Sequence, residues 1–186
     1  MTTTLSSLSP SPARTGRSAL AGVTALLAAV AYLVLAGIQL TNPPFDGTLT
    51  SPIDYANDAS FMAGMLFTIA TLIGLRKHCG ASKGAVIIAT VGLAMVSAGV
   101  SVALVTGSDP EWFVVLGLPG NLLAWAGHIW LGVWAWRRRA LPRWVAALLF
   151  VVVPVTLLLA DLGGGILAGM LWCGIGAHLL RQPAAS

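Results

Sequence analysis

The apolar stretches of this chain constrain its fold more than any other feature. A helix needs about 20 mainly apolar residues to cross the ~30 Å hydrocarbon layer of a bilayer. Six stretches approach this length, and they cover residues 19–40, 59–75, 84–106, 113–136, 144–160 and 162–180. Hydrophobic residues make up 57% of the 186 positions and charged residues only 9%, against roughly 25% charged residues in a soluble domain. The sequence therefore predicts an all-α, polytopic membrane bundle with six transmembrane helices.

The charged residues divide completely between the two kinds of gap that separate these stretches. If the N-terminus is placed in the cytoplasm, all ten Lys and Arg residues fall on the cytoplasmic side and all six Asp and Glu residues on the outer side. Lys and Arg are enriched in the cytoplasmic loops of membrane proteins. The pattern therefore predicts a multi-pass protein of the cell membrane with both termini in the cytoplasm.

The composition along the chain predicts one domain with two short tails. Residues 1–18 are rich in Ser, Thr and Pro and have no apolar period, which is typical of a disordered segment. We therefore expect a disordered cytoplasmic tail over residues 1–18, a six-helix transmembrane domain over residues 19–180, and a short cytoplasmic tail over residues 181–186.

Small residues recur at helical spacing along several of the stretches. The second stretch carries Thr68 and Thr71 among other small residues on one face, and the sixth carries Gly165, Gly169 and Cys173 at a spacing of four. Rows of small residues let two helices approach closely in a membrane. We interpret these rows as packing seams and not as sites of chemistry.

The fourth stretch carries the polar residues that lie deepest in the predicted membrane. His128 lies nine residues before Arg137, or about 13 Å at 1.5 Å per residue, which is close to the midplane. Asn121 lies seven residues before His128, so the two share one helix face, with Trp125 between them. Polar groups at this depth usually face the bundle interior. We expect Asn121, Trp125 and His128 to line a ligand cavity, although His128 could instead form only an interhelical hydrogen bond.

Two carboxylates lie at the edges of the apolar stretches. Asp58 precedes the second stretch, and Asp161 lies in the tight connection between the fifth and the sixth. Burial in an apolar cavity raises the pKa of a carboxyl group, so either residue could act as a general acid. An Asp at the start of a helix also caps it, and for both residues this alternative is open. Asp58, Asp161 and His128 are the candidate catalytic residues.

Several kinds of chemistry lack the residues that they need. The sequence contains no nucleotide-binding loop, HExxH zinc motif or nucleophile elbow. Its two cysteines are too few for a structural zinc site. His128 and His178 would lie at depths that differ by about 9 Å, which does not suit the two axial ligands of a haem. We expect no cofactor, no bound metal and no nucleic-acid partner.

Three classes of function remain compatible with these features. The first is a small non-catalytic accessory, immunity or small-ligand-binding protein, which the absence of a catalytic motif favours. The second is an intramembrane enzyme acting on an isoprenoid or lipid, with cyclase-like acid catalysis by an outer-face Asp. The third is a small proton- or cation-coupled transporter. The expected partner is the lipid bilayer, and a second copy of the chain or another membrane protein is an open alternative.

Overall fold

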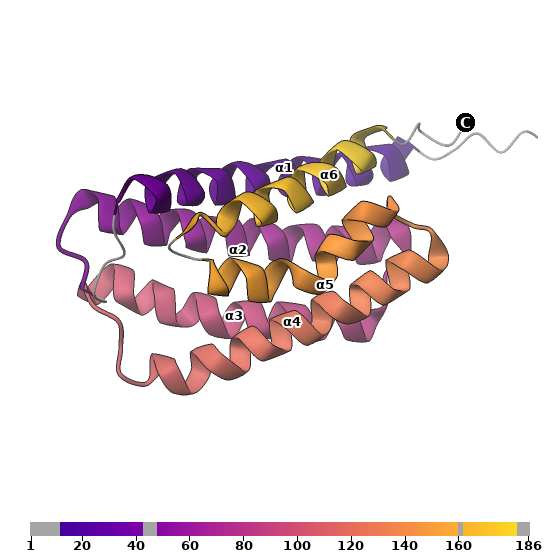
Figure 1. The fold of residues 1–186 in the computed structure, drawn as a ribbon. Coiled ribbons are helices and arrows are strands. Elements are labelled where there is room, and N and C mark those ends of the chain that lie inside the picture. Colours follow the sequence, from indigo (N-terminus) through magenta and orange to yellow (C-terminus); the bar gives the residue numbers. More distant parts are fainter. Residues whose placement is uncertain (1–11, 43–47, 160–161, 182–186) are drawn as a thin grey trace, which may run out of the picture.

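The computed structural model describes residues 12–42, 48–159 and 162–181 of this chain, and the fold over these residues is all-α (Figure 1). Its six helices are α1 (Pro12–Thr41), α2 (Pro52–Cys79), α3 (Lys83–Thr106), α4 (Phe113–Arg138), α5 (Arg143–Leu158) and α6 (Gly165–Arg181). The helices α1 to α4 each contain an apolar segment long enough to cross a membrane. The helices α5 and α6 are apolar but have only 16 and 17 residues.

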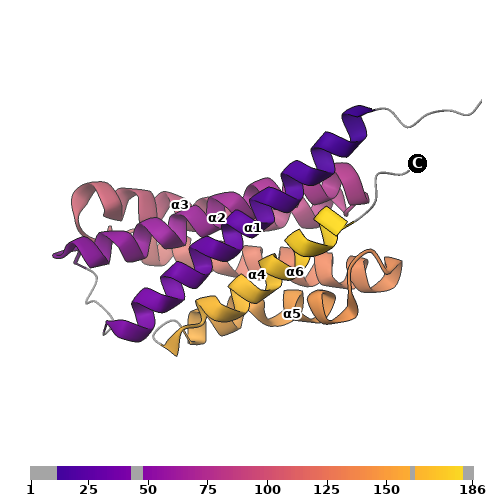
Figure 2. The same cartoon turned by 90° about the horizontal axis from the view of Figure 1, so that it is seen from above.

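The six helices form a closed ring. Each helix packs mainly against its two neighbours in sequence, and α6 returns to pack against α1 (Figures 1 and 2). Because consecutive helices run in opposite directions, the basic residues of the helix ends and loops gather at one end of the ring. We call this the basic end, and it carries Lys77, Lys83, Arg137, Arg143 and Arg181. The opposite, acidic end carries Asp54, Asp58, Asp109 and Glu111.

Backbone-to-backbone contact holds α3 against α4. A Cβ atom added at Gly92 would lie against the carbonyl oxygen of Gly120 and the backbone of Ala124, and one added at Gly127 would lie against the backbone of Ala89. No flexible side chain stands between these atoms, so the two helix axes can approach only while both positions stay glycine.

A second small-residue seam joins α6 to α1. Gly165 faces the backbone oxygen of Tyr32, and Gly169 and Gly176 also face α1. Cys173, which continues the four-residue spacing of Gly165 and Gly169, is exposed. A spacing of four advances about 40° beyond a full turn at each step, so a strict row drifts off the contact face. The predicted seam is therefore correct for the glycines and wrong for Cys173.

The start of α2 differs from the sequence prediction. The helix begins at Pro52, seven residues before the predicted apolar stretch, because Ser51 and Asp54 form a reciprocal capping box around it. Asp58 therefore lies inside the helix, and the interpretation of Asp58 as its cap is wrong. Asp58 as a whole residue is 7% exposed, and its Oδ1 atom accepts a hydrogen bond from Asn57 Nδ2 at 3.3 Å.

The other boundaries lie close to those predicted. The apolar segment of α1 begins at Ala19, as expected, although the helix itself reaches back to Pro12. The turn between α5 and α6 takes more residues than expected, and Gly163 in it has a φ of 77°, a left-handed conformation that favours glycine. Asp161 and residues 1–11 lie outside the described residues.

The seam between α3 and α4 can be tested with a matched pair of glycine substitutions. We expect Gly92→Ala to lower the free energy of unfolding by about 1–3 kcal/mol, because the new methyl group is forced against backbone atoms. Gly37→Ala is the control, since a Cβ at Gly37 meets no atom within 4 Å and alanine favours the helix by roughly 1 kcal/mol. Unfolding in mixed detergent measures both, and equal stability of the two variants would contradict the seam.

Candidate functional site

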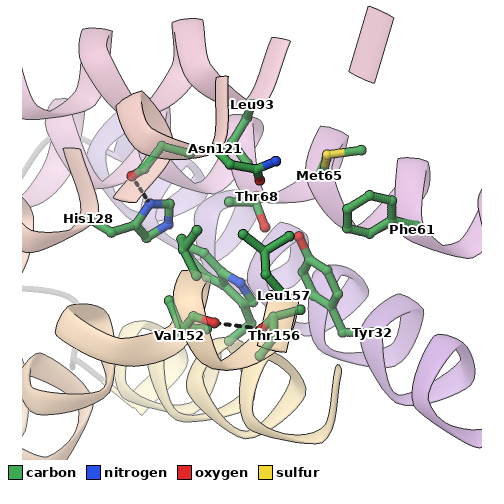
Figure 3. A pocket seen from close by; sticks show the side chains of 14 residues that line it. Tyr32, Phe61, Met65, Thr68, Leu93, Asn121, His128, Val152, Thr156 and Leu157 are labelled. Carbon is green, nitrogen blue, oxygen red and sulfur yellow. Dashed lines mark hydrogen bonds between the residues drawn. The ribbon is translucent and has the colours of Figure 1, made fainter. Parts of the chain in front are cut away.

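A cavity of about 50 Å³ lies inside the ring of helices (Figure 3). All six helices contribute to its wall. From α1 to α6 in order, examples are Tyr32, Thr68, Leu93, His128, Thr156 and Trp172. The cavity therefore exists only when the whole ring is assembled.

Three of the lining residues lie at the same level of the bundle. Thr68, His128 and Trp172 each lie nine residues before a basic residue near the end of their helix, or about 13 Å along its axis. These basic residues are Lys77, Arg137 and Arg181, respectively. Because α2, α4 and α6 all run toward the basic end, equal spacing places the three side chains at equal depth. This repeated spacing is the signal in the sequence that could have identified Thr68 and Trp172.

His128 is held in one orientation by its own helix. Its side chain is 2% exposed, and its Nδ1 atom lies 2.7 Å from the carbonyl oxygen of Ala124. A carbonyl oxygen only accepts hydrogen bonds, so Nδ1 carries the hydrogen, and the neutral ring keeps Nε2 as an acceptor. Figure 3 shows this second nitrogen on the cavity side of the ring. The ring also packs edge-on against Trp172, at 6.2 Å between centroids and 78° between planes.

The Thr68 hydroxyl is the unusual group of the cavity. Thr68 is 1% exposed, and its Oγ1 atom makes no hydrogen bond of standard geometry within the described part of the chain, although the Tyr32 hydroxyl is close enough to interact with it. The hydroxyl of buried Tyr32 points toward it (Figure 3), and Gly64 leaves space for the Tyr32 ring, since a Cβ there would come within 2.9 Å of it. The sequence predicted Thr68 only as part of a packing seam, whereas it also lines the cavity.

Asn121 lines the cavity two helical turns from His128, toward the acidic end. Its Nδ2 atom donates to the carbonyl oxygen of Gly117 at 2.9 Å, which leaves the carboxamide oxygen free to accept. Thr156, across the cavity on α5, donates its hydroxyl to the carbonyl oxygen of Val152 at 2.6 Å. The cavity thus presents the carboxamide oxygen of Asn121, Nε2 of His128 and the hydroxyls of Thr68 and Tyr32.

Trp125, the third residue of the predicted stripe, does not belong to the described wall of the cavity. Its Nε1 atom donates to the carbonyl oxygen of Phe150 on α5 at 2.8 Å. Phe150 lies four residues before Pro154, and proline has no N–H to complete that turn of the helix. The Trp125 indole therefore supplies the donor that Pro154 lacks and joins α4 to α5.

Of the two candidate acids, the one that the structure describes, Asp58, is not brought to the cavity. Asp58 lies ten residues before Thr68 on α2, about 15 Å along the axis toward the acidic end, and Asp161 lies outside the described residues. All the lining residues that the structure describes are uncharged. Over the same part of the chain, no group of three or more His, Cys, Asp or Glu side chains could hold a metal ion. The described site can donate and accept hydrogen bonds but offers no carboxylate.

Comparison with known proteins gives no further assignment, because no protein family, curated protein or solved structure matches this chain significantly. The fold defines an all-α protein in which four helices are long and apolar enough to cross a membrane. Its function must be inferred from the cavity itself.

The role of Trp125 can be tested by a double-mutant cycle with Pro154. We expect Trp125→Phe to lower the free energy of unfolding by about 0.6–1.7 kcal/mol, the range measured for interhelical hydrogen bonds in membranes. In a Pro154→Ala background, residue 154 regains its backbone N–H donor. Trp125→Phe should then lower the free energy of unfolding by measurably less. Unfolding in mixed detergent gives the four values, and an equal cost in both backgrounds would show that Trp125 does not replace the missing N–H.

Proposed function

We propose that this chain is a small, non-catalytic integral membrane protein that binds a small neutral ligand in the cavity inside the ring. One observation carries the proposal: an uncharged cavity inside the ring is lined by buried polar groups that can bond further, namely Nε2 of His128 and the neighbouring hydroxyls of Thr68 and Tyr32. Buried polar groups in proteins are normally hydrogen-bonded. A ligand bound in the cavity would form hydrogen bonds with these polar groups. Helix packing alone does not explain why they line a cavity.

The membrane topology that goes with this proposal has six spans and both termini in the cytoplasm. The basic end then faces the cytoplasm, in accord with the enrichment of Lys and Arg in cytoplasmic loops. The helices α5 and α6 measure about 24 and 26 Å at 1.5 Å per residue, somewhat less than the ~30 Å of hydrocarbon. Their apolar composition and their place in the ring support counting them as spans of the cell membrane.

The two other classes of function receive less support. An acid-catalysing enzyme needs a carboxyl group at its cavity, and Asp58, the candidate acid within the described residues, lies about 15 Å away along its helix. A cation-coupled transporter needs a charged or acidic group on its path, and the described wall is uncharged. A role as an accessory or immunity protein is compatible with ligand binding, because the same cavity could serve a partner's ligand.

The proposed topology predicts which loops are accessible from outside the cell. In a background that lacks Cys79 and Cys173, we expect an impermeant thiol reagent to label Glu111→Cys on intact cells and to leave Ala140→Cys unlabelled. Ala140→Cys should react only after the cells are permeabilised, which controls for the reactivity of that position. Labelling of Ala140→Cys on intact cells would reverse the orientation.

The binding function can be tested before the ligand is identified. Wild-type protein and the variant His128→Leu are extracted from cell membranes in polymer-bounded nanodiscs, and their bound small molecules are compared by mass spectrometry. We expect at least one neutral compound to be depleted in His128→Leu by about fivefold or more, since one lost hydrogen bond of about 1 kcal/mol has this effect.

The matched control is Thr71→Val. Thr71 is as buried as His128 but lies outside the described wall of the cavity, and its hydroxyl donates to the carbonyl oxygen of Phe67. This variant should retain the compound. Indistinguishable extracts from wild-type protein and from a folded His128→Leu variant would refute the proposed function.

A further inference from the structure

The cavity is too small for a whole organic ligand. Its volume is about 50 Å³, roughly a third of the 150 Å³ apolar cavity that admits benzene. It can therefore receive a head group of a few heavy atoms, while the rest of the ligand must lie outside it.

The polar groups of the wall define which head group fits. His128 Nε2 accepts a hydrogen bond, and the Thr68 hydroxyl can donate one. A ligand hydroxyl has both functions, since it can donate to Nε2 and accept from Oγ1. A hydrocarbon would make neither bond, and a carboxylate would bring an uncompensated charge against a lone pair of His128. The chemistry favours a neutral alcohol.

The exposure of the lining residues shows where the cavity opens. Thr68 and His128 are 1% and 2% exposed, whereas Leu157, which also lines the cavity, is 46% exposed. Leu157 lies in the last turn of α5, and its neighbours Leu158 and Leu162 are 82% and 70% exposed. The mouth therefore meets an apolar surface where α5 ends, in the half of the bundle nearer the acidic end. In a membrane that surface faces hydrocarbon.

From these three observations we infer that the ligand is a long-chain primary alcohol, an inference that rests on the proposed binding function. Its hydroxyl lies between His128 Nε2 and Thr68 Oγ1, and its hydrocarbon chain leaves the cavity past Leu157 into the lipid. A tail that stays in the hydrocarbon explains how a cavity of this size can bind a large lipophilic molecule.

The inference can be tested with a photoreactive probe. A hexadecanol that carries a diazirine near the middle of its chain is added to the full-length protein in nanodiscs, irradiated, and mapped by peptide mass spectrometry. We expect adducts on the segment that contains Leu157 and Leu162. An excess of 1-hexadecanol should abolish labelling, and equal excesses of hexadecane or palmitic acid should not.

The variants Thr68→Val and Thr71→Val form the matched pair for this experiment. Both change a buried threonine of α2, but only Thr68 lines the described cavity. We expect Thr68→Val to reduce labelling by about fivefold, the effect of one lost hydrogen bond, and Thr71→Val to label like the wild type. Unfolding of both variants without probe controls for their stability, because the Thr68 hydroxyl interacts with that of Tyr32.

Each contrary result overturns a defined part of the argument. Equal competition by palmitic acid or hexadecane, or equal labelling of the two threonine variants, overturns the alcohol as ligand. The difference in extracted molecules between wild type and His128→Leu is measured separately, so the proposed function can survive that failure. If neither the extracted molecules nor the photolabelling differs between the wild type and the variants, the cavity is not a ligand-binding site.

Discussion

Close contact between helix backbones is the constraint on which the rest of this structure depends. At Gly92 and Gly127 the backbones of α3 and α4 meet directly, and at Gly165 α6 meets the backbone of α1. These seams fix how far apart the helices stand and how each is rotated. The rotation of α4 matters most, because Ala124, which touches Gly92, also supplies the carbonyl that orients His128.

A second constraint is that polar groups inside a membrane must find partners within the protein. Most of the described ones do so locally, since Thr156, Asn121 and His128 each bond to a carbonyl four residues earlier on their own helix. The Trp125 indole supplies a donor where the helix itself has none, at the carbonyl oxygen of Phe150 that Pro154 leaves without an N–H. Thr68 Oγ1 departs from this local pattern, as do Thr90 Oγ1 and Gln39 Oε1 among the described residues, but of the three only Thr68 lines the cavity, where its neighbour is the Tyr32 hydroxyl.

The cavity combines a polar inner end with an apolar mouth, and this gradient is the basis of the chemical selectivity that we propose for it. Hydrogen-bonding groups at the level of Thr68 and His128 favour the binding of a neutral polar atom and disfavour that of a charged one. The exposed leucines at the end of α5 allow a chain to remain in hydrocarbon. For the proposed alcohol, affinity would depend on the match between head group and wall and not on the area buried, because its chain would be solvated by lipid in either state.

The sequence by itself determined the helices and much of the arrangement along them. Apolar length predicted six helical segments, the basic and acidic residues marked the two ends, and the nine-residue interval from His128 to Arg137 gave its depth. These features can be read from one chain because they depend only on helix rise and on where charges are tolerated.

Only the tertiary structure decided which face of each helix points inward. It separated Trp125 from Asn121 and His128, turned Thr68 into the cavity, and brought α6 back to α1 to close the ring. In a soluble protein the apolar stripe of a helix identifies its buried face, but lipid is as apolar as the interior of a bundle. The sequence therefore carries little signal for the rotation of a membrane helix, and the fit of small residues in the assembled ring sets it instead.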